Sequence, residues 1–388
     1  MTEPKFRAED RQPCSVGKYG AQGGWIMPRL FGRNYTKSEL LDRVGNVLQL
    51  GGVRKFVLTD GPHAGVEAVE FTTGTGFRFL AVPGRGLDVT VAEHNGRSLA
   101  WLSAAGEMSP MFYEEPGLGW LRNFPGGLVT TCGLTYAGAP CEDNGEKLGL
   151  HGRFSNTPAS NVWVDGEWDG EQYRMWAQGK IRESRLFGEN ILLKRRITAV
   201  LGENKFWIDD VVTNEGPRRT PHMILYHING GFPVVDAGSR LLSPTISATP
   251  RDADAEVDKE HYYLNDPPTH SFRERCYYHD MATDTDGFVY AGLVNYELQF
   301  GFYVKYKKSE LPEFTQWKMN GTREYVVGLE PANCRVEGRD KDRLAGRLQF
   351  LKPGETREYH LEIGVLTSEE DIRWLETTIE SILKNRQP

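Results

Sequence analysis

The sequence predicts a mainly β protein, formed by one large antiparallel domain with a helix near each end. Between the two helical segments, apolar residues mostly alternate with polar ones or form short runs, which is typical of strands. The 43 glycines and 21 prolines are spread along the 388 residues, as expected for many short strands joined by turns. No internal repeat or low-complexity linker divides the chain. We therefore expect a single domain over residues 1–388, with an N-terminal extension of about residues 1–45.

The first helix is expected to begin at Thr36, because Thr36-Lys-Ser-Glu39 has the form of a capping box. Leu41, Val44 and Leu48 then recur at helical spacing and would form one apolar face. Gly51 and the glycine that follows it would end this helix.

The second helix is expected near the end of the chain, over about residues 367–386. Thr367-Ser-Glu-Glu370 has the form of another capping box. One apolar face follows, made of Ile372, Leu375, Ile379 and Ile382. We expect this face to dock on the outside of a sheet.

Strands are expected wherever apolar residues alternate or cluster between these helices. The clearest examples are residues 77–82, 161–164, 191–200, 205–212 and 301–306. Later in the chain, Lys352-Pro-Gly-Glu355 predicts a tight turn between two further strands, residues 347–351 and 357–366.

The composition is that of an ordinary soluble protein, with 39% hydrophobic and 26% charged residues. The 53 acidic and 46 basic residues give a net charge of −7. Nucleic acids and anionic membranes both favour a basic surface, so we expect neither as a partner. The chain also lacks a run of about 18 apolar residues, which a membrane span needs.

The five cysteines, Cys14, Cys132, Cys141, Cys276 and Cys334, are odd in number, and no two form a Cys-x-x-Cys pair. This spacing fits neither a disulfide framework nor a zinc site. The first ten residues contain no apolar stretch of the kind found in a secretory signal. A cytoplasmic location is therefore expected.

His227 and Glu330 are the strongest candidates for catalysis. His227 ends an apolar strand before a Gly-Gly break, and Glu330 emerges from an apolar strand before a proline. A carboxyl in such surroundings acquires a raised pKa and can serve as a general base. The alternatives are a histidine satisfied within the core, for which His222 is the better candidate, and a rim glutamate paired with an arginine.

Two further segments could contact a polar substrate near these residues. His151 is flanked by glycines, and Arg153 would point to the same side of an extended segment. Arg85 and Asp88 lie where another strand turns, and could hold hydroxyl groups or pair with each other. For His151 and Arg153, the alternative is a turn with two surface side chains.

An extended segment would place Glu274 and Asp280 on one face, so one of these acids could reach the site. A surface strand with salt bridges is the alternative. Trp317 offers a flat apolar surface of the kind on which sugar rings stack, although a core position is as plausible. Three histidines, His151, His227 and His279, have acids nearby, but no compact ligand spacing occurs. We therefore expect no metal and no cofactor.

In the order of its motifs, the chain resembles the galactose-mutarotase-like superfamily, the aldose 1-epimerases, and looks closest to a poorly characterised bacterial branch. The resemblance covers roughly residues 45–366 and rests on Leu150-His-Gly152, on Val212-Thr-Asn214 leading into Tyr226-His227, and on Glu330. It implies a β-supersandwich of two large antiparallel sheets packed face to face.

The resemblance also implies roles for individual residues. His227 would be the general acid, Glu330 the general base, and His151 a sugar contact. Glu274 is the nearest match to the family acid that binds sugar hydroxyls, with Asp280 as the fallback. Asn229 and Trp317 complete the expected substrate contacts.

Three features depart from the family pattern. Ile228-Asn-Gly-Gly stands where Phe-Asn-Leu is common, and Arg153 stands where a second glycine is common. Glu274 stands where the family has an aspartate, which changes the reach of the carboxylate by one methylene. We expect Arg153 to pair either with Glu142, Asp143 or Asp88, or with the ligand.

The activity implied is interconversion of the anomers of a monosaccharide by acid–base ring opening. The alternatives are a non-catalytic sugar-binding or sensing protein, and an isomerase of an unusual sugar or sugar acid, which Arg85 and Arg153 would suit. The expected partner is a small carbohydrate, and the protein is expected to be a monomer or a homodimer.

Overall fold

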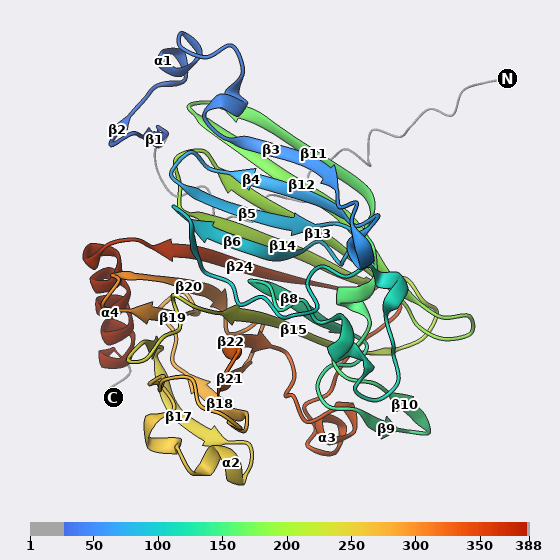
Figure 1. The fold of residues 1–388 in the computed structure, drawn as a ribbon. Helices are drawn as coiled ribbons and strands as arrows, with labels where there is room; N and C mark the ends of the chain where they lie inside the picture. The colour runs from blue at the N-terminus through green and yellow to red at the C-terminus, as the bar shows by residue number, and fades with distance from the viewer. Residues whose placement is uncertain (1–26, 386–388) are drawn as a thin grey trace, which may run out of the picture.

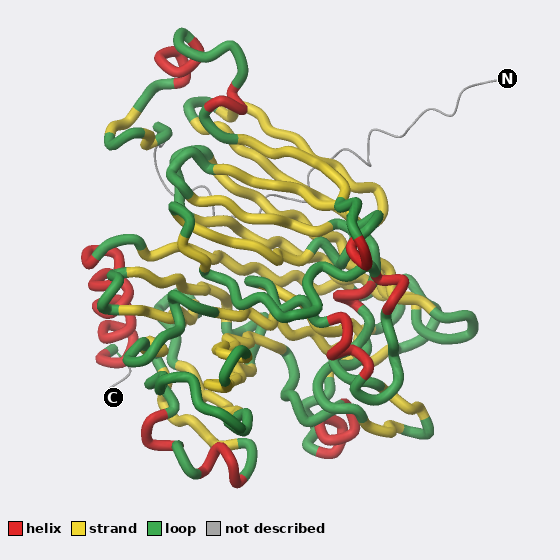
Figure 2. Tube along the Cα trace, in the orientation of Figure 1, coloured by secondary structure: helices red, strands yellow, loops and turns green. Residues whose placement is uncertain are grey.

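The computed structural model describes residues 27–385 and consists mainly of two antiparallel β-sheets (Figure 1). The predictions about Cys14 and about the first ten residues lie outside this range. Strands occupy the centre of the molecule and the helices lie at its periphery (Figure 2). The prediction of a mainly β fold with large antiparallel sheets is therefore confirmed. Among the described helices, none is both long and apolar enough to cross a membrane.

One sheet has eight strands. Their order is β11 (Ser160–Asp169), β12 (Gln172–Ser184), β13 (Asn190–Val200), β14 (Lys205–Asn214), β24 (Thr356–Leu366), β20 (Phe300–Lys307), β19 (Phe288–Asn295) and β16 (Arg240–Leu242). The runs predicted at residues 191–200, 205–212 and 301–306 all lie within these strands.

The other sheet has twelve strands. Ten of them follow the order β17 (Thr245–Pro250), β18 (Arg275–Met281), β21 (Glu313–Gly321), β22 (Glu324–Ala332), β15 (Thr220–Gly230), β8 (Val129–Leu134), β6 (Asp88–His94), β5 (Phe77–Val82), β4 (Glu67–Thr72) and β3 (Gly52–Val57). The remaining two are β23 (Gln349–Leu351), which pairs with β15, and β7 (Arg97–Ser98), which pairs with β6.

The main hydrophobic core lies between the two sheets. Phe71 and Phe79 of the twelve-stranded sheet stack with ring centroids 4.5 Å apart, and Phe79 stacks on Phe206 of the other sheet at 4.6 Å. Strands whose inward residues interdigitate in this way form a sandwich. A second cluster of buried residues, which includes Trp120, Leu225 and Ala332, lies apart from this core.

Two small hairpins and four α-helices lie outside the two sheets. They are the hairpin of β1 (Arg29–Leu30) and β2 (Arg33–Asn34), the hairpin of β9 (Cys141–Asp143) and β10 (Glu146–Leu148), and the helices α1 (Lys37–Leu41), α2 (Ala253–Glu256), α3 (Arg339–Leu344) and α4 (Glu369–Lys384). Helix α4 lies beside the ends of β19 and β20 (Figure 1).

The first predicted helix is only partly correct. The capping box at Thr36 is present, but α1 ends at Leu41. Asn46 then accepts a hydrogen bond from the backbone of Leu48 and caps a separate 3₁₀ turn, Val47–Gln49. An asparagine that caps a new turn competes with a continuous helix, so Leu41 and Leu48 are exposed instead of forming a buried face.

The two strands around Lys352–Glu355 also differ from a simple hairpin. The turn is present, but β23 pairs with β15 and β24 pairs with β14 and β20. The turn therefore carries the chain from one sheet to the other.

Candidate active site

His227 and Glu330 lie side by side on two paired strands, β15 and β22. The register places Leu225 opposite Ala332 and Ile228 opposite Leu329, so His227 stands across from Glu330. The Nε2 atom of His227 lies 3.3 Å from Oε1 of Glu330, and the two side chains are 6% and 2% exposed. Residues separated by about a hundred positions in sequence thus form one buried acid–base pair.

The pair lies on the face of the twelve-stranded sheet that points away from the sandwich core. Alternate residues of a strand point to opposite faces. Tyr226, Ile228 and Leu329 belong to the core between the sheets. Leu225 and Ala332, which share a face with His227 and Glu330, belong to the second cluster. The second cluster therefore surrounds the acid–base pair.

Gly328 leaves the room that the pair occupies. A Cβ atom at this position would lie 2.9 Å from Oε1 of Glu330, 3.2 Å from Cε1 of His227 and 3.1 Å from Cβ of Trp317. All three distances are too short for ordinary contacts, so a side chain here would displace the groups around it. The glycine allows three side chains from three neighbouring strands to meet.

Aromatic rings enclose His227. The ring centroids of Phe124, Trp317 and His151 lie 5.5, 5.3 and 5.8 Å from that of His227. Trp120 packs on His151 at 4.8 Å. Such rings exclude water from the pair and offer flat apolar surfaces to a ligand.

Burial shifts the pKa values of the pair in opposite directions. It raises the pKa of Glu330 to about 8, with Glu274 adding to the shift and Arg251 opposing it. It lowers the pKa of His227 to about 3, with the neighbouring His151 adding to the shift and Asn229 opposing it. Both shifts favour the neutral forms, so at neutral pH the pair holds one proton, on the carboxyl.

His151 reaches the site from a loop with an unusual backbone. Its φ of 58° lies in the left-handed region, and the carbonyls of Gly138 and Gly133 bracket the loop through hydrogen bonds from His151 and Arg153. Burial lowers the pKa of His151 to about 4, and its Nδ1 atom is buried without a hydrogen-bond partner. A neutral imidazole with a free nitrogen is suited to contact a hydroxyl group.

Glu274 and Trp317 lie together at the edge of the site. Nε1 of Trp317 donates to Oε2 of Glu274 at 2.9 Å, and Arg251 donates to Oε1 at 3.0 Å. Asp280, six residues further along, is 49% exposed and pairs with Lys308 at 2.8 Å. Six residues of strand span about 20 Å, so of the two acids Glu274 is the one beside Glu330.

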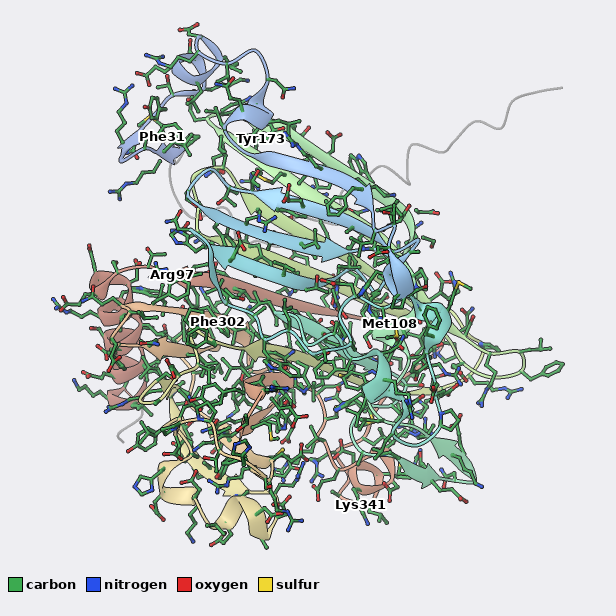
Figure 3. All side chains as sticks on the ribbon, in the orientation of Figure 1. Phe31, Arg97, Met108, Tyr173, Phe302 and Lys341 are labelled. Carbon is green, nitrogen blue, oxygen red and sulfur yellow. The ribbon has the colours of Figure 1, made fainter. Side chains whose placement is uncertain are left out.

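Arg85 and Asp88 do not pair with each other. The guanidinium of Arg85 donates to the carbonyls of Met108 and Asn123, and so holds the loop on which Figure 3 labels Met108. Asp88 accepts hydrogen bonds from Arg195 at 2.6 Å and from the backbone of Thr131 at 2.9 Å. Contact of either residue with a sugar stays a prediction.

Arg153 pairs with Glu115, which is not one of its predicted partners. Its Nε and Nη2 atoms donate to Oε1 of Glu115 at 2.8 and 2.5 Å, and Nη1 lies 3.8 Å from Glu189. The expected partners Asp143 and Asp88 bind other arginines. Contact of Arg153 with a ligand stays a prediction, although Glu115 already pairs with its guanidinium.

Several residues around the pair were not predicted from the sequence. Trp120 and Phe124 come from the long segment between β7 and β8, which has no repeating pattern, and Gly328 lies within an apolar strand. No sequence signal distinguishes these residues from core or turn positions. The other candidate, Asn229, lies two residues from His227 on the same face of β15.

Among the described residues, no group of three or more His, Cys, Asp or Glu side chains could hold a metal ion. The chain belongs to the family of the domain of unknown function DUF4432, whose model matches residues 63–365. No curated protein matches the sequence.

Solved structures place the fold among the mutarotase-like proteins. A Klebsiella pneumoniae protein, provisionally described as an aldose 1-epimerase, is 26% identical with a TM-score of 0.83, and the match covers 86% of this chain and 88% of that one. A galactose mutarotase-like protein from Clostridium acetobutylicum is 11% identical with a TM-score of 0.57, covering 82% and 99%. Galactose 1-epimerase from Lactobacillus acidophilus is 13% identical with a TM-score of 0.53, covering 82% and 100%. The predicted resemblance to this superfamily is confirmed.

Proposed function

We propose that this protein is an aldose 1-epimerase that interconverts the anomers of a neutral monosaccharide. The observation that carries the proposal is the buried pair of His227 and Glu330, whose reactive atoms lie 3.3 Å apart. The anomeric hydroxyl and the ring oxygen of a sugar are bonded to the same carbon. Ring opening therefore needs an acid and a base that lie next to each other.

The number of protons that His227 and Glu330 hold between them suits this reaction. Glu330, in its ionised form, takes the proton of the anomeric hydroxyl, and a C1 carbonyl forms as the bond from C1 to the ring oxygen breaks. Protonated His227 gives its proton to the ring oxygen, which keeps the electrons of that bond. Rotation about C1–C2 and the reverse transfers close the ring as the other anomer. One proton in total on the pair suffices for both directions.

Placing the proton initially on Glu330 has a consequence for the first step. The carboxyl must pass its proton to Nε2 of His227 before it can act as a base, and the 3.3 Å contact allows that transfer directly. The burial that raises the pKa of Glu330 also makes its ionised form a stronger base.

The charges near the site favour a neutral sugar over a sugar acid. Arg85 and Arg153 motivated the acidic substrate, but both are bonded to protein groups. Arg251 lowers the pKa of Glu330, but its charge is shared by Asp252 and Glu274. We propose that Glu274, His151 and Trp317 contact the sugar hydroxyls and ring face.

The cellular location of the protein is part of the same proposal. The four cysteines in the described residues, Cys132, Cys141, Cys276 and Cys334, are all free. Free cysteines suit a reducing compartment, which supports a cytoplasmic location. The partner we propose there is a small sugar.

Anomer exchange in a panel of common neutral aldoses, followed by polarimetry or NMR, tests the activity. Glu330→Gln and His227→Asn should each reduce the rate on the order of 10²–10⁴-fold. Calorimetry with the same sugars separates the alternatives. A sugar-binding protein without catalysis would bind a sugar but would not accelerate its anomer exchange. Glu330→Gln would then have no catalytic activity to lose. The epimerase proposal fails if no aldose exchanges faster with the protein than without it.

A further inference from the structure

Of the buried polar atoms near the acid–base pair that have no hydrogen-bond partner, two belong to β15. They are Nδ1 of His227 and Oδ1 of Asn229. Because the two residues are separated by one position on β15, their side chains lie on the same face of the sheet. Buried polar groups are almost always satisfied, so two adjacent unsatisfied atoms call for an explanation.

The orientation of the Asn229 amide is fixed by its nitrogen. Nδ2 donates to the carbonyl of Gly127 and to that of His227, both at 3.0 Å. These two bonds use both hydrogens of the amide nitrogen. A flipped amide would direct its oxygen at two carbonyl oxygens, so Oδ1 remains the acceptor that faces away from them.

The state of the His227 ring follows from its contact with Glu330. The carboxyl holds the shared proton at neutral pH, because burial raises its pKa. Nε2 of His227, 3.3 Å from Oε1, is then the atom placed to accept that proton. A neutral imidazole then carries its own hydrogen on Nδ1, and Nδ1 forms no hydrogen bond with the rings of Phe124, Trp317 and His151 that surround it.

We propose that Asn229 is a positioning residue, whose side-chain oxygen accepts the Nδ1 hydrogen of His227 and so holds Nε2 toward Glu330 and the sugar. Neither atom has another hydrogen-bond partner in this structure. The Asn229 side chain raises the pKa of His227 against the effect of burial, which is the direction expected of an oxygen facing Nδ1–H.

This inference rests on the proposed function for its catalytic consequence, but not for its structural content. The hydrogen bond made by one ring nitrogen decides which nitrogen carries the proton. With Asn229 in place, Nε2 is free to receive a proton from Glu330 and deliver it to the ring oxygen. Without it, the ring can adopt the other tautomer, in which Nε2 already bears a hydrogen and cannot accept one.

The decisive measurement is the tautomer of His227 in the intact protein, read from two-bond ¹H–¹⁵N correlations after ¹⁵N-histidine labelling. The wild type should show the hydrogen on Nδ1. Asn229→Ala should shift the ring to a mixture or to Nε2–H. Asn229→Asp keeps an oxygen at this position and should keep the Nδ1–H form, with the His227 titration moved to higher pH by the added charge. A wild-type Nε2–H ring, or an Asn229→Ala ring identical to the wild type, overturns the proposal.

Steady-state kinetics provide the second test. Asn229→Ala should reduce kcat on the order of 10–100-fold and leave KM nearly unchanged, whereas a residue that binds the sugar would raise KM. Asn320→Ala is a matched control, because Asn320 is also buried with an unpaired Oδ1 but is outside the site. If the tautomers behave as expected and no sugar is turned over, the epimerase proposal fails and the positioning role stands. If Glu330→Gln abolishes turnover while Asn229→Ala changes neither tautomer nor kcat, the positioning role fails alone.

Discussion

Gly328 shows how much of the site depends on a residue with no side chain. Three groups converge on the space above it, the carboxyl of Glu330, the ring of His227 and the stem of Trp317. Its neighbours in β22 are apolar and buried. The glycine at position 328 therefore determines how closely His227 and Glu330 can approach each other.

Gly328→Ala should therefore impair catalysis more than it impairs folding. The added methyl would push on Glu330 and His227, at 2.9 and 3.2 Å. A displacement approaching 1 Å can cost roughly 10²-fold in rate, while overpacking costs about 1–3 kcal/mol of unfolding free energy. Steady-state kinetics and urea unfolding measure the two effects. Gly45→Ala is the control, since a Cβ there meets nothing within 4 Å. Full activity in Gly328→Ala would show that the pair tolerates displacement.

The raised pKa of Glu330 predicts a pH-dependent stability difference between the wild type and Glu330→Gln. Between the ordinary glutamate value of 4.5 and the folded value of about 8, the native carboxyl holds a proton that the unfolded chain has lost. The native state binds more protons, so wild-type stability falls as pH rises through this window. Glutamine does not titrate. As pH rises through this window, the unfolding free energy of the wild type should therefore fall relative to that of Glu330→Gln by roughly 1.4 kcal/mol per pH unit.

Denaturant unfolding of both proteins at several pH values from 5 to 8 measures this difference. A difference that is constant across that range would mean that Glu330 titrates normally in the folded protein. The carboxyl would then be ionised at neutral pH, and the pair would hold no proton unless His227 carried one.

Helix α4 was predicted accurately because its signals are local. The apolar face of Ile372, Leu375, Ile379 and Ile382 is buried as expected. Only the cap differs. Ser368, not Thr367, is the N-cap and accepts from the backbone of Asp371, while Thr367 donates to the Asp371 carboxylate. Boundaries shift by one residue in this way because neighbouring hydroxyls compete for the same backbone groups.

Ser368→Ala should lower the unfolding free energy by about 1 kcal/mol, the usual cost of losing an N-cap oxygen. Ser381→Ala makes the same chemical change at an exposed position inside α4 and should stay within about 0.5 kcal/mol of the wild type. Thermal or urea unfolding of the three proteins compares them directly. Equal stabilities for Ser368→Ala and the wild type would mean that another group satisfies the backbone of Asp371.

The contrast between α4 and the site residues marks what the sequence can predict. Strand identity, the acid–base pair and the terminal helix follow from local periodicity and from polar residues in apolar runs. The partners of Arg85, Asp88 and Arg153 do not, because each is fixed by a residue far away in the chain, as Asp88 is by Arg195, 107 positions on. A pairing with a distant residue leaves no trace in the local sequence pattern.

Strands of the two sheets alternate along the chain. β3 to β8 form one sheet, β11 to β14 the other, and β15 returns to the first. Arg195 of β13 crosses the interface between them. It is fully buried and contacts Asp88 of β6 and Asp210 of β14, each at 2.6 Å, and Tyr226 of β15 donates to the same Asp210. One charged group thus connects four strands from both sheets.

Arg195→Met should consequently destabilise the whole protein in a single transition. The substitution leaves the carboxylates of Asp88 and Asp210 buried without a cation, and breaking a buried ion pair costs about 3–5 kcal/mol. Arg182→Met on the neighbouring strand removes an exposed pair with Glu215 and should cost about 0–1 kcal/mol. Circular dichroism and tryptophan fluorescence should report coincident unfolding in both variants, because the strands of the two sheets form one cooperative core. Separate transitions by the two probes would instead mean that the sheets unfold independently, and that the Arg195 network does not link them energetically.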